Sequence, residues 1–401
     1  MPPISSSRTP LRTFGWRTLA VAAALALAVP SGAAAATAEP PQGPPGDEFY
    51  QPPAPLPDGV NGDVIWWREL PQQLGTKAYL VLYRSESATG RPIAVTGRVL
   101  VPTTEWRGEG ERPVVSIGSG TRGIGDDCAP SKFQPDYERP LVEPMLQRGW
   151  AVAITDYEGL GTPGTHPYVV GKSEGRTVID AARAATGLPA AGLSPDGPIA
   201  FSGYSQGGGA AAWAGELSPD YAPEMDVVGV AAGGNPADLA AVSTFLDGGI
   251  GFGFAMLTAA GFDAAYPELD LMSFLNDKGK ETFEEEKDAC VDAVFGHAFE
   301  RLKDYTTHSP LEDPRWQARL EENSLGSRPQ QAPIYLFHGT HDEILPRDQA
   351  EGLRDQYCAA GSEVTWRTFP GEHVSTLITG AGSAVDYLAD RFDGDTPESD
   401  C

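Results

Sequence analysis

A serine flanked by glycines is the first feature of the chain that could do chemistry. The run GYSQG at residues 203–207 has Ser205 at its centre and fits the G-x-S-x-G nucleophile elbow. In that motif a sharp strand-to-helix turn exposes the serine hydroxyl at a helix N-terminus, where the dipole favours negative charge. An apolar run at 198–202 leads in, and a small-residue run at 208–215 leads out. We therefore predict that Ser205 is a nucleophile; the alternative is a tight structural turn.

A serine hydroxyl needs a general base, which histidine commonly supplies. In elbow-type hydrolases the chain order is serine, then an acid, then histidine. Of the six histidines, only His373 follows all the expected strands. The acid should follow the preceding strand, where Asp342 and Glu343 are adjacent. We predict a triad of Ser205, Asp342 and His373, because the rival Glu343 adjoins the apolar segment that follows.

Stabilising a tetrahedral oxyanion requires two hydrogen-bond donors. One is expected to be the backbone N–H of Gln206, the residue after the nucleophile. The other is expected from the glycine-rich loop at 118–125, where Thr121 is the first choice and Gly120 and Arg122 are alternatives.

Two further groups of residues could belong to a site. His338 and His341 could suggest a metal site, but their spacing fits none of the usual metal motifs. We therefore expect neither a metal nor another cofactor. The turn DYEGLGTPG at 156–164 could line the site, but a role in bracing the loops is favoured.

The elements that would position these residues follow from apolar runs that alternate with helical patterns. Residues 78–84 and 93–101 are expected to form paired strands. Further strands are expected at 113–117, 151–155, 198–202, 226–231, 333–338 and 364–369, and helices near 139–148, 175–187, 206–216 and 374–391. This alternation predicts an α/β-hydrolase fold with a mostly parallel central sheet.

One region interrupts the alternation and is expected to form a helical cap. Residues 233–327 contain no strong strand pattern and would be inserted between two parts of the core, 59–232 and 328–401. Six apolar residues of this region could line an acyl tunnel or pack inside the cap: Phe245, Phe252, Phe254, Met256, Leu257 and Phe262.

The first 38 residues have the order of a secretory signal peptide, with a basic start, an apolar run at 19–29 and small residues after it. The apolar run is too short for a membrane-spanning helix. We therefore expect an extracellular protein. Residues 39–58, rich in proline, are expected to form an extended arm.

The charge and the cysteines narrow the possible partners and the compartment. The formal net charge is −26, and all acidic residues lie at or after Glu39. Such a surface repels nucleic acid, so no nucleic-acid partner is expected. Four cysteines in an exported chain suggest two disulfides, and composition leaves all three pairings open.

Taken together, these motifs resemble the secretory lipase family, the fungal lipase A type with an actinobacterial branch. The matching segments, in matching order, are DCAPS at 127–131, DYEGLG at 156–161, GYSQGG at 203–208, HGTHD at 338–342 and GEH at 371–373. The resemblance implies hydrolysis of triacylglycerols and simpler esters, a helical cap, and an oxyanion donor near Thr121. It also implies the disulfides Cys128–Cys290 and Cys358–Cys401.

We therefore expect a secreted serine hydrolase, a lipase or carboxylesterase, that cleaves carboxylic esters through an acyl-enzyme. Its partner would be a small-molecule or lipid ester, with a lipid–water interface in reach of the cap. One alternative is a peptidase or amidase on the same fold. Another is an inactive binding module, against which the complete triad argues. The sequence leaves the acyl and alcohol preference and the oligomeric state open.

Overall fold

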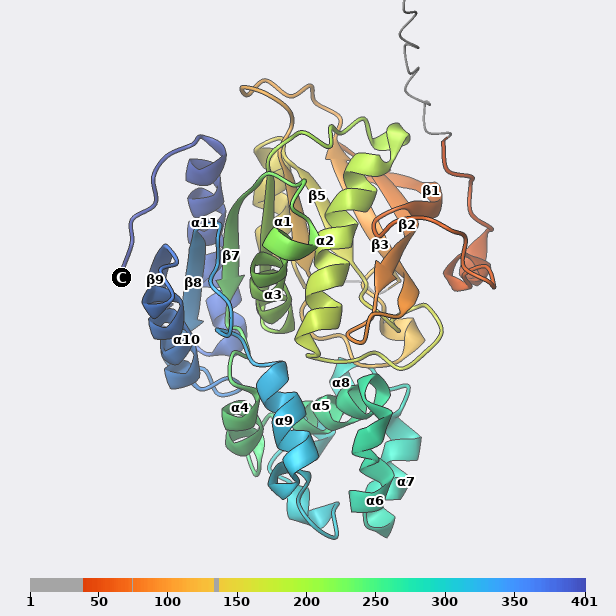
Figure 1. Cartoon of the computed structure of the whole chain (residues 1–401), viewed down its shortest axis with the longest axis vertical. Coiled ribbons are helices and arrows are strands. Elements are labelled where there is room, and N and C mark those ends of the chain that lie inside the picture. Colours follow the sequence, from red (N-terminus) through yellow and green to blue (C-terminus); the bar gives the residue numbers. More distant parts are fainter. Residues whose placement is uncertain (1–38, 74, 133–136) are drawn as a thin grey trace, which may run out of the picture. The chain divides into compact units, whose positions relative to one another are not determined.

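The computed structural model describes residues 39–73, 75–132 and 137–401, so the expected signal peptide lies outside the described residues. Within them, nine strands form one sheet in the order β1-β2-β3-β5-β4-β6-β7-β8-β9 (Figure 1). The strands are β1 (Val64–Gln73), β2 (Thr76–Glu86), β3 (Pro92–Pro102), β4 (Val114–Gly118), β5 (Ala151–Thr155), β6 (Ile199–Tyr204), β7 (Val227–Gly233), β8 (Ile334–Gly339) and β9 (Val364–Phe369).

The pairing direction changes once across the sheet. β1, β2, β3 and β5 pair antiparallel in turn, whereas every pairing from β5 through β4 and β6 to β9 is parallel. This mostly parallel sheet confirms the expected α/β-hydrolase fold. The sequence does not predict β1, because residues 64–73 lack alternation and contain Pro71. Pro71 is tolerated in this strand because β1 is an edge strand.

Helices cover both faces of the sheet. α2 (Gly171–Gly187), α3 (Gln206–Tyr221) and α10 (Arg347–Ala359) pack on one face. α1 (Arg139–Gln147) and α11 (His373–Phe392) pack on the other. The strands between these layers are apolar on both sides, which is why they appear in the sequence as continuous apolar runs.

Between β7 and β8 the chain forms a helical segment, which we call the cap and whose helices lie together at the lower end of Figure 1. An apolar cluster that includes Phe262, Phe274 and Trp316 packs the cap helices together and against residues 168–170 of the core. Its α-helices are α4 (Leu239–Leu246), α5 (Phe252–Ala265), α6 (Leu271–Phe274), α7 (Asp277–Glu286), α8 (Val291–Val294) and α9 (Pro314–Glu322).

Two disulfides join distant parts of the chain. Cys128–Cys290 joins the loop after β4 to the cap across 162 residues of sequence. Cys358–Cys401 joins α10 to the C-terminal segment. This is the pairing that the family resemblance implies.

The proline-rich segment 39–58 contacts the sheet in two ways. Pro41 and Gly43 form backbone hydrogen bonds with Trp67 of β1, and the helical turn Gly46–Tyr50 buries Phe49 and Tyr50 against β1 and β2. None of the described helices combines the length and the apolar character needed to cross a membrane.

Candidate active site

Ser205 lies at the turn between β6 and α3, in a strained backbone conformation. Its φ is +61°, a region that non-glycine residues seldom adopt. The turn is possible because its neighbours are glycines: a Cβ on Gly203 would lie 2.2 Å from the carbonyl oxygen of Gly207. A Cβ on Gly207 would lie 2.0 Å from the carbonyl oxygen of Gly118. The elbow therefore requires these glycines.

The three residues of the expected triad come together as one hydrogen-bonded relay. Ser205 Oγ lies 2.9 Å from His373 Nε2, and His373 Nδ1 lies 2.7 Å from Asp342 Oδ2. Ser205 follows β6, Asp342 follows β8, and His373 begins α11 after β9. The parallel sheet thus brings together residues that are up to 168 positions apart.

Asp342 is held as an anion that faces the imidazole. Its Oδ1 accepts hydrogen bonds from the N–H groups of Ile344 at 3.0 Å and Leu345 at 2.8 Å. Burial opposes the charge, but the hydrogen bond with His373, the nearby His373 and His338 imidazoles and the Leu345 N–H together outweigh burial and lower the pKa of Asp342. The neighbouring Glu343 instead accepts from the backbone N–H of His373 at 3.0 Å. The geometry thus favours Asp342 over Glu343 as the acid.

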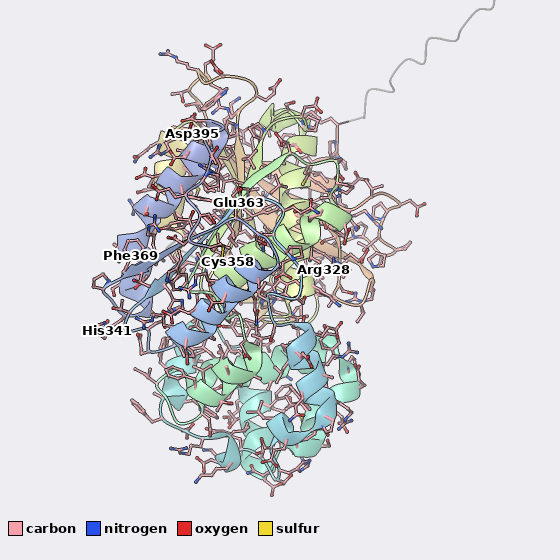
Figure 2. The ribbon with its side chains drawn as sticks, turned by 60° about the vertical axis from the view of Figure 1, so that its left-hand side comes forward. Arg328, His341, Cys358, Glu363, Phe369 and Asp395 are labelled. Atoms are coloured by element: carbon pink, nitrogen blue, oxygen red, sulfur yellow. A yellow bond between two sulfur atoms is a disulfide. The ribbon has the colours of Figure 1, made fainter. Side chains whose placement is uncertain are left out.

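The other two histidines near the acid have different surroundings. His338 is buried, its Nε2 lies 2.9 Å from the carbonyl oxygen of Leu345, and burial lowers its pKa. His341 is exposed at the edge of the molecule (Figure 2). Among the described residues, no group of three or more His, Cys, Asp and Glu side chains is placed to hold a metal ion.

The two expected oxyanion donors come from the start of α3 and from the loop after β4. Gln206 opens α3, so its N–H belongs to the first turn, whose amides have no acceptor within the helix. Thr121 lies in the loop after β4, and its hydroxyl shares a 2.8 Å hydrogen bond with Tyr168, which lines the cavity at Ser205. Of the alternatives, the Gly120 N–H already donates to Glu138 at 2.9 Å, and the Arg122 side chain also bonds Glu138. Thr121 therefore remains the first choice.

The turn at 156–164 braces the loops. Asp156 is buried and accepts hydrogen bonds from the Thr96 hydroxyl at 2.6 Å and the Ser131 N–H at 2.8 Å. It thus ties β3 to the loop after Cys128, the bracing role that was favoured.

The cavity at Ser205 has a volume of about 30 Å³ and lies between the core and the cap. Of the six apolar cap residues considered for a tunnel, Phe254 lines it, whereas Phe252, Leu257 and Phe262 are buried within the cap. Most of the apolar wall comes from residues that no sequence motif marks, although the i, i+3, i+7 spacing on α4 is a signal that could identify three of them. That wall consists of Leu239, Val242 and Leu246 from α4 together with Ile344 and Leu345.

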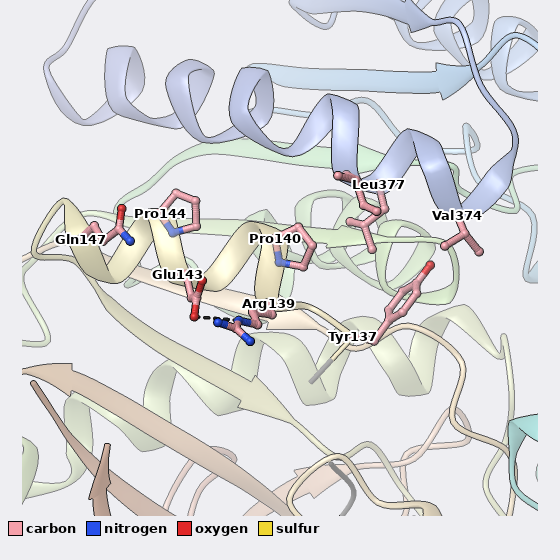
Figure 3. Close-up of a pocket in the computed structure, with 9 residues that line it drawn as sticks. Tyr137, Arg139, Pro140, Glu143, Pro144, Gln147, Val374 and Leu377 are labelled. Atoms are coloured by element: carbon pink, nitrogen blue, oxygen red, sulfur yellow. Dashed lines mark hydrogen bonds and ion pairs between the residues drawn. The ribbon is translucent and has the colours of Figure 1, made fainter. Parts of the chain in front are cut away.

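A second hollow, of about 450 Å³, opens between α1 and α11 (Figure 3). Its apolar side includes Tyr137, Pro140 and Val374, and Val374 directly follows the triad histidine. The aromatic ring of Tyr137 stands against Gly120 of the glycine-rich loop. The hollow is therefore adjacent to both the triad histidine and the oxyanion loop.

Known proteins resemble this chain both in sequence and in structure. Residues 129–400 match the model of the family described as secretory lipase. A secreted triacylglycerol lipase of Malassezia furfur is 28% identical, with 88% of this chain and 77% of the relative covered. A probable inactive lipase of Mycobacterium tuberculosis is 31% identical, with coverage of 87% and 82%. The structure of Candida antarctica lipase A in its closed state superimposes with a TM-score of 0.77 at 25% identity, covering 85% of this chain and 84% of that one.

Proposed function

The chain belongs to the secretory lipase family and is a carboxylic ester hydrolase; on that premise, we propose that it is a secreted lipase acting on triacylglycerols and related esters through Ser205, His373 and Asp342. The observation that carries the proposal is the hydrogen-bonded relay among these three side chains. The proposal includes a signal peptide at 1–38 and a cap at 233–327 within a core of 59–232 and 328–401. Two disulfides are in keeping with an oxidising compartment.

In the proposed reaction, Ser205 Oγ attacks the carbonyl carbon of the ester while its proton moves to His373 Nε2. The N–H of Gln206 and the Thr121 region stabilise the oxyanion of the tetrahedral intermediate. The C–O bond to the alcohol then breaks, and His373 protonates the leaving oxygen. Water, deprotonated by His373, releases the acid from Ser205 in a second addition. Throughout, Asp342 keeps the imidazole tautomer whose Nε2 can accept the serine proton.

The size of the cavity implies that the cap moves. A volume of about 30 Å³ holds roughly one or two water molecules and no acyl chain. We infer that α4 and α5 separate from Ile344 and Leu345 when an ester enters. The acyl chain would then lie along the α4 face formed by Leu239, Val242 and Leu246.

The exposed apolar side chains suggest the surface that meets the lipid. Among the described residues, seven large apolar side chains are exposed, and one of them, Val60, lies in the N-terminal region. Four of the others lie in the cap and two lie in α11, the helix that His373 begins: Phe245, Ile250, Phe295 and Phe299, and Val374 and Ile378. Phe295 packs on Phe254 of the cavity wall, with ring centroids 5.9 Å apart. The Phe299 N–H donates to Gly249, beside Ile250.

We call these six residues the apolar rim and propose that they contact an uncharged lipid–water interface. A net charge of −26 disfavours both anionic lipid and a second copy of this chain as the partner.

One experiment tests the proposed function directly. The purified chain and a Ser205→Ala variant are treated with a fluorophosphonate probe and assayed with nitrophenyl esters of increasing acyl length, with triolein emulsion and with an amide substrate. We expect labelling and ester turnover by the parent chain only, with longer acyl chains preferred. Failure of the parent chain to label would favour an inactive module, as in the relative named a probable inactive lipase. Faster amide than ester turnover would favour a peptidase.

A further inference from the structure

Glu174 is a buried acid behind the nucleophile elbow that the proposed mechanism does not use. It lies in the first turn of α2 and is 2% exposed. Its Oε1 accepts a hydrogen bond from the Gln206 carboxamide at 2.7 Å. Gln206 Nε2 also lies 2.8 Å from His166 Nε2, and His166 Nδ1 lies 2.8 Å from the carbonyl oxygen of Glu158. The side chain of Gln206 is thus fixed between two buried partners.

The same carboxyl oxygen holds a strained loop on the other side of the site. It accepts a hydrogen bond from the N–H of Val169 at 2.8 Å. Val169 has φ +53°, a rare and costly conformation for a β-branched residue, and such strain persists only where surrounding contacts impose it. The preceding residue, Tyr168, shares the hydrogen bond with the Thr121 hydroxyl. Glu174 therefore supports the loop that positions Tyr168.

One buried oxygen thus connects both sides of the expected oxyanion hole. On one side, the Glu174 oxygen bonds the side chain of Gln206, whose own backbone N–H is the expected first donor. On the other side, it bonds Val169, and the adjacent Tyr168 bonds Thr121, the expected second donor. We propose that Glu174 is a positioning residue that sets the spacing between the two oxyanion donors. This inference rests on the proposed function, because it assigns Glu174 a role only if Ser205 forms an acyl-enzyme.

The protonation states of Glu174 and His166 are compatible with a rigid support for the oxyanion loop. Burial raises the pKa of Glu174 to about 8, and burial lowers the pKa of His166 to about 4. At neutral pH both groups are therefore mostly uncharged, and the network needs no buried counter-ion.

Glu216 is a matched buried acid remote from the triad. It is also 2% exposed, and it accepts one backbone N–H, from Gly326 at 2.7 Å, and one side-chain donor, the Tyr357 hydroxyl at 2.7 Å. Deleting its carboxyl group removes the same kinds of hydrogen bond from the core without touching the oxyanion hole. Glu216 is thus the control for a purely structural effect.

The test compares Glu174→Met, Glu174→Gln and Glu216→Met with the parent chain. Each protein is measured for kcat and KM with a nitrophenyl ester, for inhibition by an alkyl boronic acid, and for melting temperature. The boronic acid forms a tetrahedral adduct on Ser205 and so reports on the oxyanion hole separately from substrate binding.

We expect Glu174→Met to lower kcat by about 10- to 100-fold, because losing one oxyanion donor outright costs about 100- to 1,000-fold and here the donors are only displaced. KM should stay within about twofold, and the boronate inhibition constant should rise in step with the loss in kcat. Glu174→Gln keeps an acceptor oxygen and should retain about a third or more of kcat. Glu216→Met should lower the melting temperature and leave kcat unchanged.

Equal kcat values for Glu174→Met and Glu216→Met, or a rise in KM without a fall in kcat, would overturn the proposal. If Glu174→Met does not fold, Tyr168→Phe is measured in its place, because it removes the hydroxyl that bonds Thr121 and keeps the aromatic ring. A several-fold lower kcat at constant KM supports the proposal, and an unchanged kcat refutes it. A parent chain that neither hydrolyses esters nor binds the boronate refutes the proposed function itself, and the inference with it.

Discussion

Replacing Asp342 with asparagine tests the acid of the triad, and the structure predicts why this variant should lose activity. Asp342 Oδ1 accepts two backbone N–H groups, from Ile344 and Leu345. In Asp342→Asn the amide oxygen must stay on these donors, so the amide nitrogen faces His373 Nδ1. The amide N–H then donates to His373 Nδ1, which places the imidazole proton on Nε2. The imidazole can no longer take the proton of Ser205.

The expected loss is large because the general base is removed. A wrong imidazole tautomer in a serine triad lowers kcat by about 10,000-fold, which corresponds to about 5.5 kcal/mol of transition-state free energy. The control is Glu343→Gln, in which the amide oxygen can still accept the N–H of His373. We expect its kcat to stay within about threefold of the parent value.

The assay is steady-state hydrolysis of a nitrophenyl ester, with circular dichroism melting to confirm that each variant is folded. The kcat of Asp342→Asn should recover partly at high pH, where hydroxide replaces the general base. The reasoning would be refuted if folded Asp342→Asn kept kcat within about tenfold of the parent chain while Glu343→Gln lost more.

Three further predictions concern other parts of the molecule. Replacing Cys128 and Cys290 with serine opens a loop of 162 residues and should lower the free energy of unfolding by about 5 kcal/mol, measured by urea denaturation; a change below about 1 kcal/mol would contradict the loop-entropy argument. The pKa of Glu174 is raised to about 8 in the folded chain, which therefore holds a proton that the unfolded chain releases. The free energy of unfolding that Glu174 contributes should fall as the pH rises from about 4.5, the ordinary pKa of a glutamate, to about 8, and Glu174→Gln should flatten this slope relative to the parent chain. Within the apolar rim, Phe295→Ser with Phe299→Ser should weaken binding of the Ser205→Ala protein to triolein emulsion, while in the parent background it should leave kcat on a soluble acetyl ester unchanged; unaltered emulsion binding would remove these residues from the interface.

Much of the core is predictable because its strands are buried on both faces. The runs at 113–117, 151–155 and 198–202 correspond to β4, β5 and β6 with small shifts at their ends. β1 is not predictable in the same way, because as an edge strand it keeps polar residues and Pro71 without losing its one partner. Its position depends on pairing with β2, a contact that no local pattern encodes.

The site residues also differ in how far local sequence predicts them. The sequence indicates Ser205 and His373 through a motif and through chain order, and the structure brings both into one relay. Local sequence does not separate Asp342 from Glu343; the two backbone donors at Ile344 and Leu345 favour Asp342. Glu174 could not be identified from the sequence, because its partner Gln206 is 32 positions away.

The contacts between the cap and the oxyanion loop bear on how the cap can open. Near the Cys128–Cys290 disulfide, the Ile124 N–H donates to Ala289 at 3.1 Å, and the Val291 N–H donates to Arg122 at 2.8 Å. These directional bonds join one side of the cap to the loop that carries Thr121. On the other side, an apolar cluster joins α4 to the loop after Asp342 through Val242, Leu246, Ile344 and Leu345.

Separating that apolar cluster breaks no covalent bond, and an acyl chain or a lipid surface can replace the lost contacts. Opening at the disulfide side would instead pull on the oxyanion loop. We therefore expect the cap to pivot about residues 289–291 and to open at α4, so that the substrate enters while the Thr121 side of the oxyanion hole stays in place.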